Sequence, residues 1–426
     1  MSALRFEIEA RSASCAARVG RVRTLHGEFV TPAFMPVGTK GSVKGIPPWM
    51  VASTGAEVVL ANTYHLLLRP GPESVSRRGG LHAFTGWPAS MLTDSGGYQV
   101  YSLADISKIT EEGVAFRSVI DGAVVKMSPE SATRTQNLLG ADIIMAFDDC
   151  PPSVDPKSVN QTRRRMGGTA EGEGGSKRTQ VDHEKRVGEA CERTIRWLKR
   201  CVEAHERADA QSLFGIVQGG TDLERRSWCA REVRAFDLPG YAIGGVAVGE
   251  GHEEIVRVVN HTAGLLPEER PRYLMGVGYE RDILAAVRAG VDMFDCVLPT
   301  RNGRNANAFT RTGQLRLRNA ACAEDDGPIE EGCDCPACAP VGAWGDLQVG
   351  GASPKGWFSR AYLRHLFLSG EMLGGILVSL HNLRHFQRLL LDIRTAIRDD
   401  GWSALARRWP VLEQAGGDTS ADGAQD

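Results

Sequence analysis

The stretch VDMFDCVLPT, residues 291–300, carries the pattern that decides the fold. It is apolar, too short for an ordinary helix, and it places a carboxylate, Asp295, after the first apolar residues. Similar runs precede it at residues 31–39, 56–65, 90–100, 141–150, 213–220, 240–250 and 272–279. Most intervals between them show helical periodicity, as residues 183–207 do. Eight apolar strands alternating with helices predict a (β/α)8 TIM barrel, with an open doubly wound sheet as the alternative.

Composition excludes several classes of protein. The 426 residues include 50 Lys+Arg and 52 Asp+Glu, so the net charge is −2 and any nucleic-acid site must be local. We expect no membrane association, because no apolar run approaches the roughly 20 residues of a membrane span. The N-terminal residues are charged and lack the apolar core of a signal peptide. We therefore expect a cytoplasmic protein whose ten cysteines are buried, metal-bound or catalytic rather than paired.

Polar or glycine residues end seven of the eight runs. They are Asn62, Asp94, Asp148 with Asp149, Gln218, Gly244 with Gly245, Gly276, and Asp295. In a TIM barrel the C-terminal strand ends form the active site. One such residue would merely terminate a strand, but four acids and a glutamine at equivalent ends favour a site. A carboxylate, an amide and bare backbone N–H groups can read the edge of guanine, and Tyr98 offers a face for stacking.

Three cysteines form the most specific local motif, CDCPAC. They are Cys333, Cys335 and Cys338. Three thiols within six residues suit one tetrahedral, structural Zn²⁺ rather than a catalytic one, and unrelated free cysteines are the alternative. Spacing alone leaves the fourth ligand open among three histidines that follow: His365, His381 and His385.

Arginines gather just after the last apolar run. Residues 299–319 contain five of them and no acidic residue: Arg301, Arg304, Arg311, Arg316 and Arg318. Such a basic strip in a nearly neutral protein is typical of phosphate contacts, although a solvated loop would have the same composition. Its position directly after Asp295 favours the first interpretation.

Taken together, the motifs LTDSGGYQV, AFDDCPP, FDCVLPTRNGRN, CDCPAC and HNLR resemble those of the bacterial tRNA-guanine transglycosylases. The resemblance runs from about residue 5 to residue 410. It implies a TIM barrel with an inserted zinc-binding subdomain near the C-terminus. It also implies a homodimeric enzyme of queuosine biosynthesis. Such an enzyme exchanges the wobble guanine in the anticodon loop of GUN-anticodon tRNAs for a 7-deazaguanine, 7-aminomethyl-7-deazaguanine, through a covalent aspartyl-ribose intermediate.

The resemblance also assigns roles to matched positions. Asp295 would be the nucleophile, Asp94 the general acid/base, and Arg301 and Arg304 the contacts to neighbouring nucleotides. The base would lie among Asp94, Ser95, Tyr98, Asp148, Gln218, Gly244, Gly245 and Met275, with Tyr98 and Met275 on its two faces. The zinc ligands would be Cys333, Cys335, Cys338 and His381.

The expected organisation is a single catalytic domain over residues 1–412, with the zinc-binding subdomain at about 318–385 and a disordered tail at 413–426. Val217 and Val246 depart from the Gln and Leu usual in bacterial members, which leaves the incoming base less certain. Insertions at 161–182 and 339–357 are also unusual; we expect the first to be a dispensable surface loop, with a second RNA contact as the alternative.

Two other functions compete with this interpretation. One is a non-catalytic tRNA-binding partner subunit, which would be expected to lack the carboxylates Asp94 and Asp295. The other is a zinc-dependent TIM-barrel hydrolase, which would need His and carboxylate ligands at strand ends rather than a cysteine cluster after the eighth strand.

Overall fold

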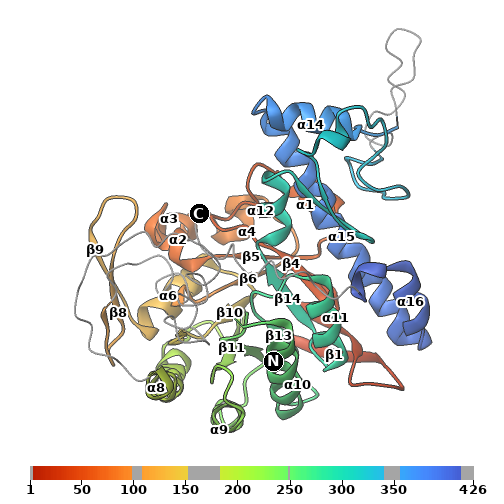
Figure 1. The fold of residues 1–426 in the computed structure, drawn as a ribbon. Helices are drawn as coiled ribbons and strands as arrows, with labels where there is room; N and C mark the ends of the chain where they lie inside the picture. The colour runs from red at the N-terminus through yellow and green to blue at the C-terminus, as the bar shows by residue number, and fades with distance from the viewer. Residues whose placement is uncertain (1–2, 98–107, 152–182, 248–249, 340–355, 414–426) are drawn as a thin grey trace.

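The computed structural model describes residues 3–97, 108–151, 183–247, 250–339 and 356–413, and it has the predicted (β/α)8 architecture (Figure 1). Eight parallel strands form one sheet in the order β4-β14-β13-β12-β11-β10-β6-β5. A parallel bridge between Val37 and Leu60 joins β4 to β5, and the Gly38 N–H donates to the Leu60 carbonyl at 2.7 Å. These contacts close the sheet, so the open doubly wound alternative is wrong.

Each of the eight predicted apolar runs contains one barrel strand. The strands are β4 (Ala33–Pro36), β5 (Val58–Ala61), β6 (Ser90–Thr93), β10 (Ile143–Met145), β11 (Ser212–Val217), β12 (Gly240–Ile243), β13 (Arg272–Leu274) and β14 (Met293–Cys296). All residues of β11 and β12 are buried, as expected for parallel strands with a packed interior and helices outside. The polar residues predicted at strand ends therefore all lie at the same mouth of the barrel.

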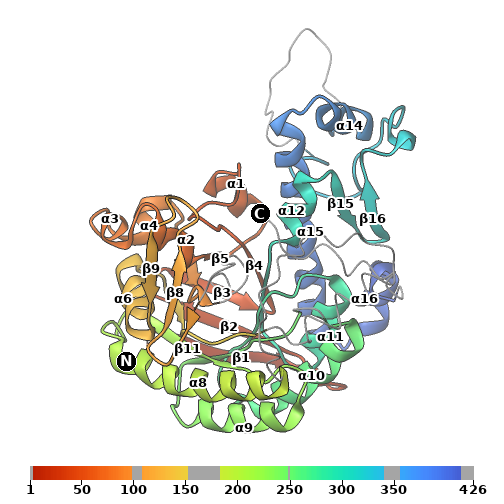
Figure 2. The ribbon, with the colours of Figure 1, turned by 60° about the vertical axis from the view of Figure 1, so that its left-hand side comes forward.

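Helices surround the barrel, most of them between consecutive strands (Figure 2). They are α1 (Pro48–Ser53), α2 (Thr63–Leu68), α3 (Pro72–Ser76), α4 (Gly80–Thr85), α6 (Pro129–Leu139), α8 (His183–Ala204), α9 (Leu223–Arg234), α10 (His252–Leu265), α11 (Glu280–Arg288) and α12 (Leu298–Arg304). The predicted helix at 183–207 is confirmed by α8, which buries the face that contains Val187, Cys191 and Leu198. None of the described helices is long and apolar enough to cross a membrane.

An antiparallel sheet that the sequence pattern did not reveal lies at the N-terminal ends of the barrel strands. It consists of β1 (Arg5–Arg11), β2 (Arg18–Thr24) and β3 (Gly27–Thr31). Val22 and Phe29 are fully buried in the same cluster as the barrel-interior residues Met35 and Phe214. The sheet thus seals the end of the barrel opposite the candidate site. Another small sheet follows β6: β7 (Lys108–Ile109), β8 (Val114–Arg117) and β9 (Val124–Met127).

The described part of the chain after α12 contains a two-stranded hairpin and several helices, and it includes the cysteine cluster of the predicted zinc-binding subdomain. It contains the hairpin of β15 (Asn307–Thr310) and β16 (Gly313–Arg316), the 3-10 turn Ala320–Cys322, α14 (Arg360–Leu368), α15 (Met372–Asp399), α16 (Trp402–Arg408) and the 3-10 turn Pro410–Leu412. The long helix α15 runs from this subdomain along the barrel, and Gln387 on it donates to the Phe34 carbonyl of β4 at 3.0 Å. Helix α15 therefore packs against both the barrel and the C-terminal part of the chain.

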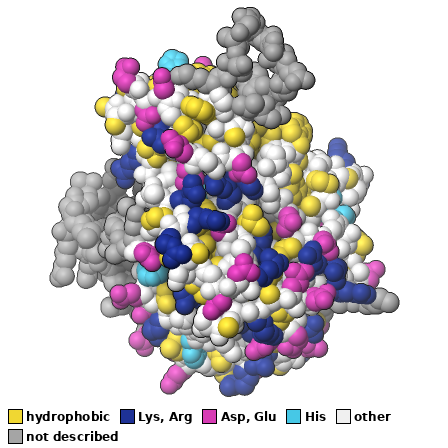
Figure 3. Space-filling model, turned by 90° about the vertical axis from the view of Figure 1, so that its right-hand side faces the viewer, with side chains coloured by type: hydrophobic (Ala, Val, Ile, Leu, Met, Phe, Trp, Pro, Cys, Tyr) yellow, Lys and Arg dark blue, Asp and Glu magenta, His cyan; other side chains and the backbone are white. Residues whose placement is uncertain are grey.

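Charges of both signs are mixed on the surface that includes α15 and α16 (Figure 3). Lys and Arg side chains gather near the middle of this view, with Asp and Glu side chains among them. Ion pairs of α15 and α16 include Arg384 with Asp334 at 2.6 Å and Arg408 with Asp392 at 2.8 Å. This agrees with the small net charge of the chain.

Candidate active site

Asp295 lies on β14 at the open mouth of the barrel. The Tyr273 hydroxyl of β13 donates to Asp295 Oδ1 at 2.6 Å, and the Gly276 N–H donates to the same oxygen at 2.9 Å. Burial raises the pKa of Asp295, while these two hydrogen bonds act in the opposite direction. Among the described residues both donors bind Oδ1, which leaves Oδ2 as the oxygen available to an electrophile.

The loop that supplies this N–H is shaped by two glycines. Gly276 has a φ of +75°, a conformation that costs little only for glycine. A Cβ on Gly278 would lie 2.5 Å from the Cys296 side chain, so the loop packs directly against the residue next to Asp295. Substitution at either position would displace the backbone donor.

Asp94 follows β6 and is buried, with 7% of its surface exposed. The Thr63 N–H, at the first turn of α2, donates to its Oδ1 at 2.8 Å, and the Asn62 amide donates to its Oδ2. Both residues come from the end of β5, the neighbouring barrel strand. These donors fix the carboxylate in one orientation and compensate its burial.

The adjacent acids Asp148 and Asp149 have different environments. Asp148 accepts hydrogen bonds from Gln218 Nε2 at 2.7 Å and Ser95 Oγ at 3.4 Å. Burial raises its pKa to about 7; the Gln218 hydrogen bond opposes this, and the charge of Asp149 adds to it. Asp149 instead forms ion pairs with Arg186 at 2.6 Å and Arg193 at 2.5 Å. Asp149 is thus a structural residue, and Asp148 is the one held with the predicted site residues.

Gly244 and Gly245 allow the backbone to pass beside Gln218. A Cβ on Gly245 would lie 2.3 Å from Gln218 Oε1, and one on Gly244 would lie 2.7 Å from Nε2. The buried Arg226 guanidinium donates to both glycine carbonyls, at 2.8 and 2.9 Å. With the carbonyls turned toward Arg226, the glycines contribute backbone rather than side chains to the site.

The remaining predicted base contacts have different outcomes. Met275 directly follows β13, is partly buried, and packs against the barrel-interior cluster. Tyr98, predicted to stack on the base, lies outside the described residues. The insertion at 161–182, most of that at 339–357, and the tail from residue 414 also lie outside them.

Arg301 and Arg304 lie on a short helix that directly follows β14. The helix is α12, with Pro299 in its first turn, where the missing proline N–H breaks no hydrogen bond. Both arginines lie in its last turn and are partly buried. A spacing of three residues places them on one face, directly after the strand of Asp295.

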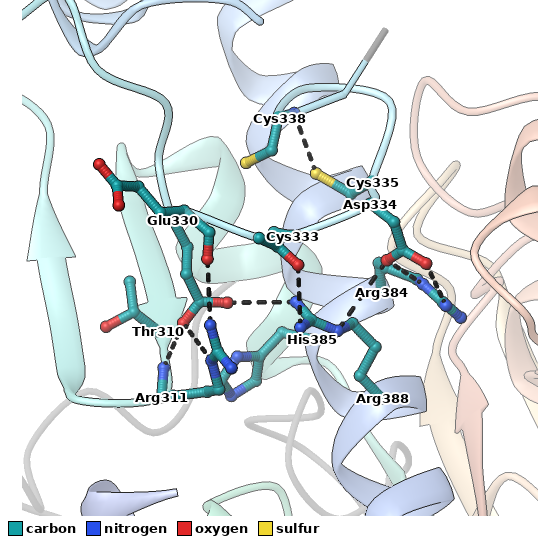
Figure 4. Close-up of polar contacts among 12 residues, drawn as sticks. Thr310, Arg311, Glu330, Cys333, Asp334, Cys335, Cys338, Arg384, His385 and Arg388 are labelled. Atoms are coloured by element: carbon teal, nitrogen blue, oxygen red, sulfur yellow. Dashed lines mark hydrogen bonds and ion pairs between the residues drawn. The ribbon is translucent and has the colours of Figure 1, made fainter. Parts of the chain in front are cut away.

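The three cysteines and His381 come together in a buried cluster beside α15 (Figure 4 shows the cysteines). His381 Nδ1 lies 3.6 Å from the Cys333 sulfur and 3.4 Å from those of Cys335 and Cys338. In a tetrahedral site with bond lengths of about 2.3 Å to sulfur and 2.1 Å to nitrogen, ligand atoms are about 3.6 Å apart. The distances from His381 thus match those around a single metal ion, and all four ligand atoms lie within 4.8 Å of one another.

A hydrogen bond sets the histidine tautomer for this role. His381 Nε2 donates to the Phe309 carbonyl at 2.7 Å, which leaves the Nδ1 lone pair directed at the three sulfurs. His365 is exposed and lies beside Ser369, and His385 bonds to Glu280 at 2.9 Å. The question that spacing left open is thus resolved in favour of His381 as the fourth member of the cluster.

Comparison with known proteins identifies the family. A model of the queuine tRNA-ribosyltransferase family matches residues 13–171 and 177–411. The chain belongs to this family. A queuine tRNA-ribosyltransferase of Thermus thermophilus is 49% identical over 409 residues, covering 96% of this chain and 94% of the relative.

Other queuine tRNA-ribosyltransferases are similar over nearly the same length. That of Symbiobacterium thermophilum is 48% identical, covering 96% of this chain and 93% of the relative. That of Synechococcus elongatus is 46% identical, covering 94% and 93%. Membership places the chain among tRNA-guanine transglycosylases, which are glycosyltransferases, and confirms the predicted family and enzyme class. A zinc-dependent hydrolase is excluded by the same finding.

Proposed function

We propose that this enzyme exchanges the wobble guanine of GUN-anticodon tRNAs, those for Asp, Asn, His and Tyr, for 7-aminomethyl-7-deazaguanine. The observation that carries the mechanism is the environment of Asp295. Its carboxylate is held through Oδ1 by Tyr273 and Gly276 on a barrel strand, and the helix that follows this strand carries Arg301 and Arg304. A fixed carboxylate with one oxygen available is a nucleophile suited to an anomeric carbon.

In the first step Asp295 Oδ2 attacks C1′ of the wobble ribose, and the bond from C1′ to the base nitrogen breaks. The electron pair goes to guanine, which receives a proton at its imidazole edge, and an aspartyl-ribose ester remains. In the second step the incoming base loses the corresponding proton and displaces the carboxylate. Two displacements retain the anomeric configuration, and one glycosidic bond replaces another, so the exchange needs no external energy source.

Asp94 is proposed to transfer these protons. Its two oxygens are oriented by donors from Asn62 and Thr63, which hold the carboxylate in place while it gains and loses a proton. The charges of Asp295 and Asp94 both contribute to the raised pKa of the buried Tyr273 hydroxyl, which supports a shared site for the two carboxylates. Their separation of roles follows the two-carboxylate logic of glycoside chemistry.

Base recognition is assigned to Asp148, Gln218, Ser95 and the backbone at Gly245, with Met275 and Tyr98 on the faces of the ring. The Asp148 carboxylate suits the N1–H and N2–H donors of guanine, and an amide or backbone N–H suits O6. Gln218 donates to Asp148, so we expect the base to replace or share that contact.

Zn²⁺ is proposed as the metal of the Cys333, Cys335, Cys338 and His381 cluster, one ion per chain. Three thiolates and one imidazole form a closed set of four protein ligands, which is typical of structural zinc. When bound, the ion links the cysteine loop to α15 and has no position for substrate. Arg301 and Arg304 are proposed to contact RNA phosphates, and a homodimer is the proposed assembly.

A trapping experiment tests the central proposal. Wild-type enzyme and an Asp295→Asn variant are incubated with substrate tRNA, and covalent complexes are separated on a denaturing gel. The amide retains an oxygen that accepts from Tyr273 and Gly276 but is a poor nucleophile. We expect an adduct and exchange of labelled guanine only with wild type, and equal tRNA affinity for both proteins. An adduct that persists in the variant refutes the assignment.

The same assay separates the enzyme from a non-catalytic partner subunit. A partner subunit would bind tRNA without any exchange of labelled guanine. Addition of the purified chain alone to tRNA and labelled guanine therefore decides between the two functions, and we expect incorporation at a single position, the wobble nucleotide.

A further inference from the structure

Helix α15 contacts the segments that precede and follow the nucleophile strand. Asn382 donates to the Pro299 carbonyl at 2.8 Å and the Asn307 carbonyl at 3.0 Å, so it holds both ends of the segment around α12. One turn after the metal-cluster residue His381, His385 Nε2 lies 2.9 Å from Glu280 Oε1. Glu280 is the first residue of α11 and follows the loop that bears Gly276.

The His385–Glu280 pair is unusual in being both polar and buried. His385 is fully buried and Glu280 is 4% exposed. Because a carboxylate only accepts, Nε2 must carry the proton, and no described residue offers a partner to Nδ1. Replacing a buried polar pair with apolar side chains of similar volume is often neutral or stabilising. Stability alone therefore does not account for this pair.

The ring of His385 has little freedom to turn away from Glu280. Its centroid lies 5.0 Å from that of Trp409, 5.3 Å from Phe386 and 5.9 Å from Phe309. Close packing by three aromatic rings fixes the direction of Nε2. Glu280 is consequently bound to a rigid point on α15.

Only the four residues 276–279 precede Glu280 in the loop whose first residue, Gly276, donates to Asp295. This loop includes Gly278, whose Cα has no room for a side chain against Cys296, and the buried Val277. A short segment held at both ends transmits a displacement of α11 to the Gly276 N–H. That N–H is one of the two donors on Asp295.

We propose that His385 and Glu280 are positioning residues. They fix the start of α11 on α15, and thereby keep the Gly276 N–H in hydrogen-bonding position on Asp295. This proposal rests on the proposed function only where it concerns the rate of reaction. Its structural part, the order of the 276–279 loop, stands independently of the role of Asp295.

The test uses a set of full-length variants. Glu280→Gln keeps an oxygen that can accept from His385 Nε2. The double variant Glu280→Met with His385→Phe replaces the pair by apolar side chains of similar size. His82→Phe is the matched control, because His82 bonds to the buried Asp142 at 3.1 Å, at the opposite end of the barrel.

Two readouts are measured on proteins shown to be folded by thermal denaturation. The first is hydrogen exchange of the peptide containing residues 275–279 without tRNA. The second is the single-turnover rate of adduct formation. For the double variant we expect faster exchange, and a rate lower by about tenfold or more with tRNA affinity within about twofold. For Glu280→Gln and His82→Phe we expect wild-type exchange and rates.

A pH profile adds a readout that a purely structural pair would not affect. Because the Gly276 N–H lowers the pKa of Asp295, its loss should shift the acidic limb of the single-turnover rate to higher pH. Tyr273 from β13, Cys296 on β14 and Asp94 after β6 are the titratable groups nearby, and none is altered in the double variant.

The outcomes separate the two proposals. If wild type forms no adduct at Asp295, the proposed function fails, and the exchange of residues 275–279 still decides the positioning proposal. If the folded double variant shows wild-type exchange in that peptide, or reacts at the wild-type rate with an unshifted pH profile, the positioning proposal is overturned.

Discussion

Replacement of Asp148 by asparagine should make the protein more stable near neutral pH while impairing base binding. Asp148 is buried between Gln218 and Ser95, and burial raises its pKa to about 7 from 3.8. The folded protein therefore holds this proton to a higher pH than the unfolded chain does. In the Asp148→Asn variant the amide oxygen can accept from Gln218 and the amide N–H can donate to Ser95, so neither neighbour loses its partner.

The magnitude follows from proton linkage. The stability that the protonated Asp148 confers is present below the unfolded pKa of about 4 and is lost as the pH rises to about 7. The loss is at most about 1.4 kcal/mol per pH unit, or roughly 4 kcal/mol in total. The variant has no proton to lose at this position. Its unfolding free energy relative to wild type should thus rise between pH 4 and pH 7 and level off above.

Urea denaturation of both proteins at half-unit steps from about pH 2.5 to pH 8 measures this difference and also covers the range below pH 4 that the control needs. Titration of all other groups cancels when wild type is subtracted from variant. A control of opposite sign is Asp142→Asn: burial acts to raise the pKa of Asp142, but hydrogen bonds from His82 and His26 outweigh it and lower the pKa. For this pair, the greater unfolding free energy of wild type relative to Asp142→Asn should be lost as the pH falls below about 4.

A flat difference between pH 4 and pH 7 for Asp148→Asn would refute the reasoning, because it would mean that the carboxylate is ionised throughout in the folded state. Base binding gives a second check. The carboxylate is the form that accepts from guanine N1–H and N2–H, so KM for the base in wild type should rise as the pH falls below about 7. KM in the variant should be higher and should lack this dependence.

Two further predictions concern the metal and the RNA. Metal analysis should give about one zinc per chain. Cys335→Ala and His381→Ala should lower both that ratio and the melting temperature, whereas His365→Ala should change neither. Loss of metal only in the His365 variant would contradict the proposed ligands. Replacing Arg301 and Arg304 with alanine should raise KM for tRNA and make it less dependent on salt, while KM for the base stays within about twofold. An equal rise in KM for both substrates would instead indicate a damaged barrel.

The barrel could be predicted because its strands are apolar throughout. A strand buried on both faces is a continuous apolar run without alternating polar residues, and the first polar or glycine residue marks its end. Asp94, Asp148, Gln218 and Asp295 were recognised in this way, and the structure places all of them at the same mouth of the barrel. The N-terminal sheet escaped prediction because strands such as β1 (Arg5–Arg11) alternate charged and partly buried residues without a strong apolar signal.

The residues that orient the site could not be predicted from the pattern. Tyr273 lies inside an apolar strand, so the sequence pattern indicates a core residue. Its hydroxyl nevertheless donates to Asp295 at 2.6 Å. Thr63 contributes a backbone N–H, which carries no signature in the side chain. Arg226 is a buried guanidinium on a helix that the sequence presents as polar. Each of these residues acts through contacts with segments that are distant in the sequence, so its role can be recognised only in the folded structure.

Asp148 and Asp149 show why neighbouring acids at one strand end acquire different functions. Successive residues of an extended segment point in opposite directions, so only one of the two can face the barrel axis. Asp149 points toward α8, where Arg186 and Arg193 neutralise it. Among the described residues, the hydrogen bonds that Asp148 accepts come from the neutral Gln218 and Ser95, and the nearby charge of Asp149 further raises its pKa. The charge of Asp149 thus helps Asp148 to keep its proton near neutral pH. A carboxyl group that titrates in this range can change its charge when the base binds.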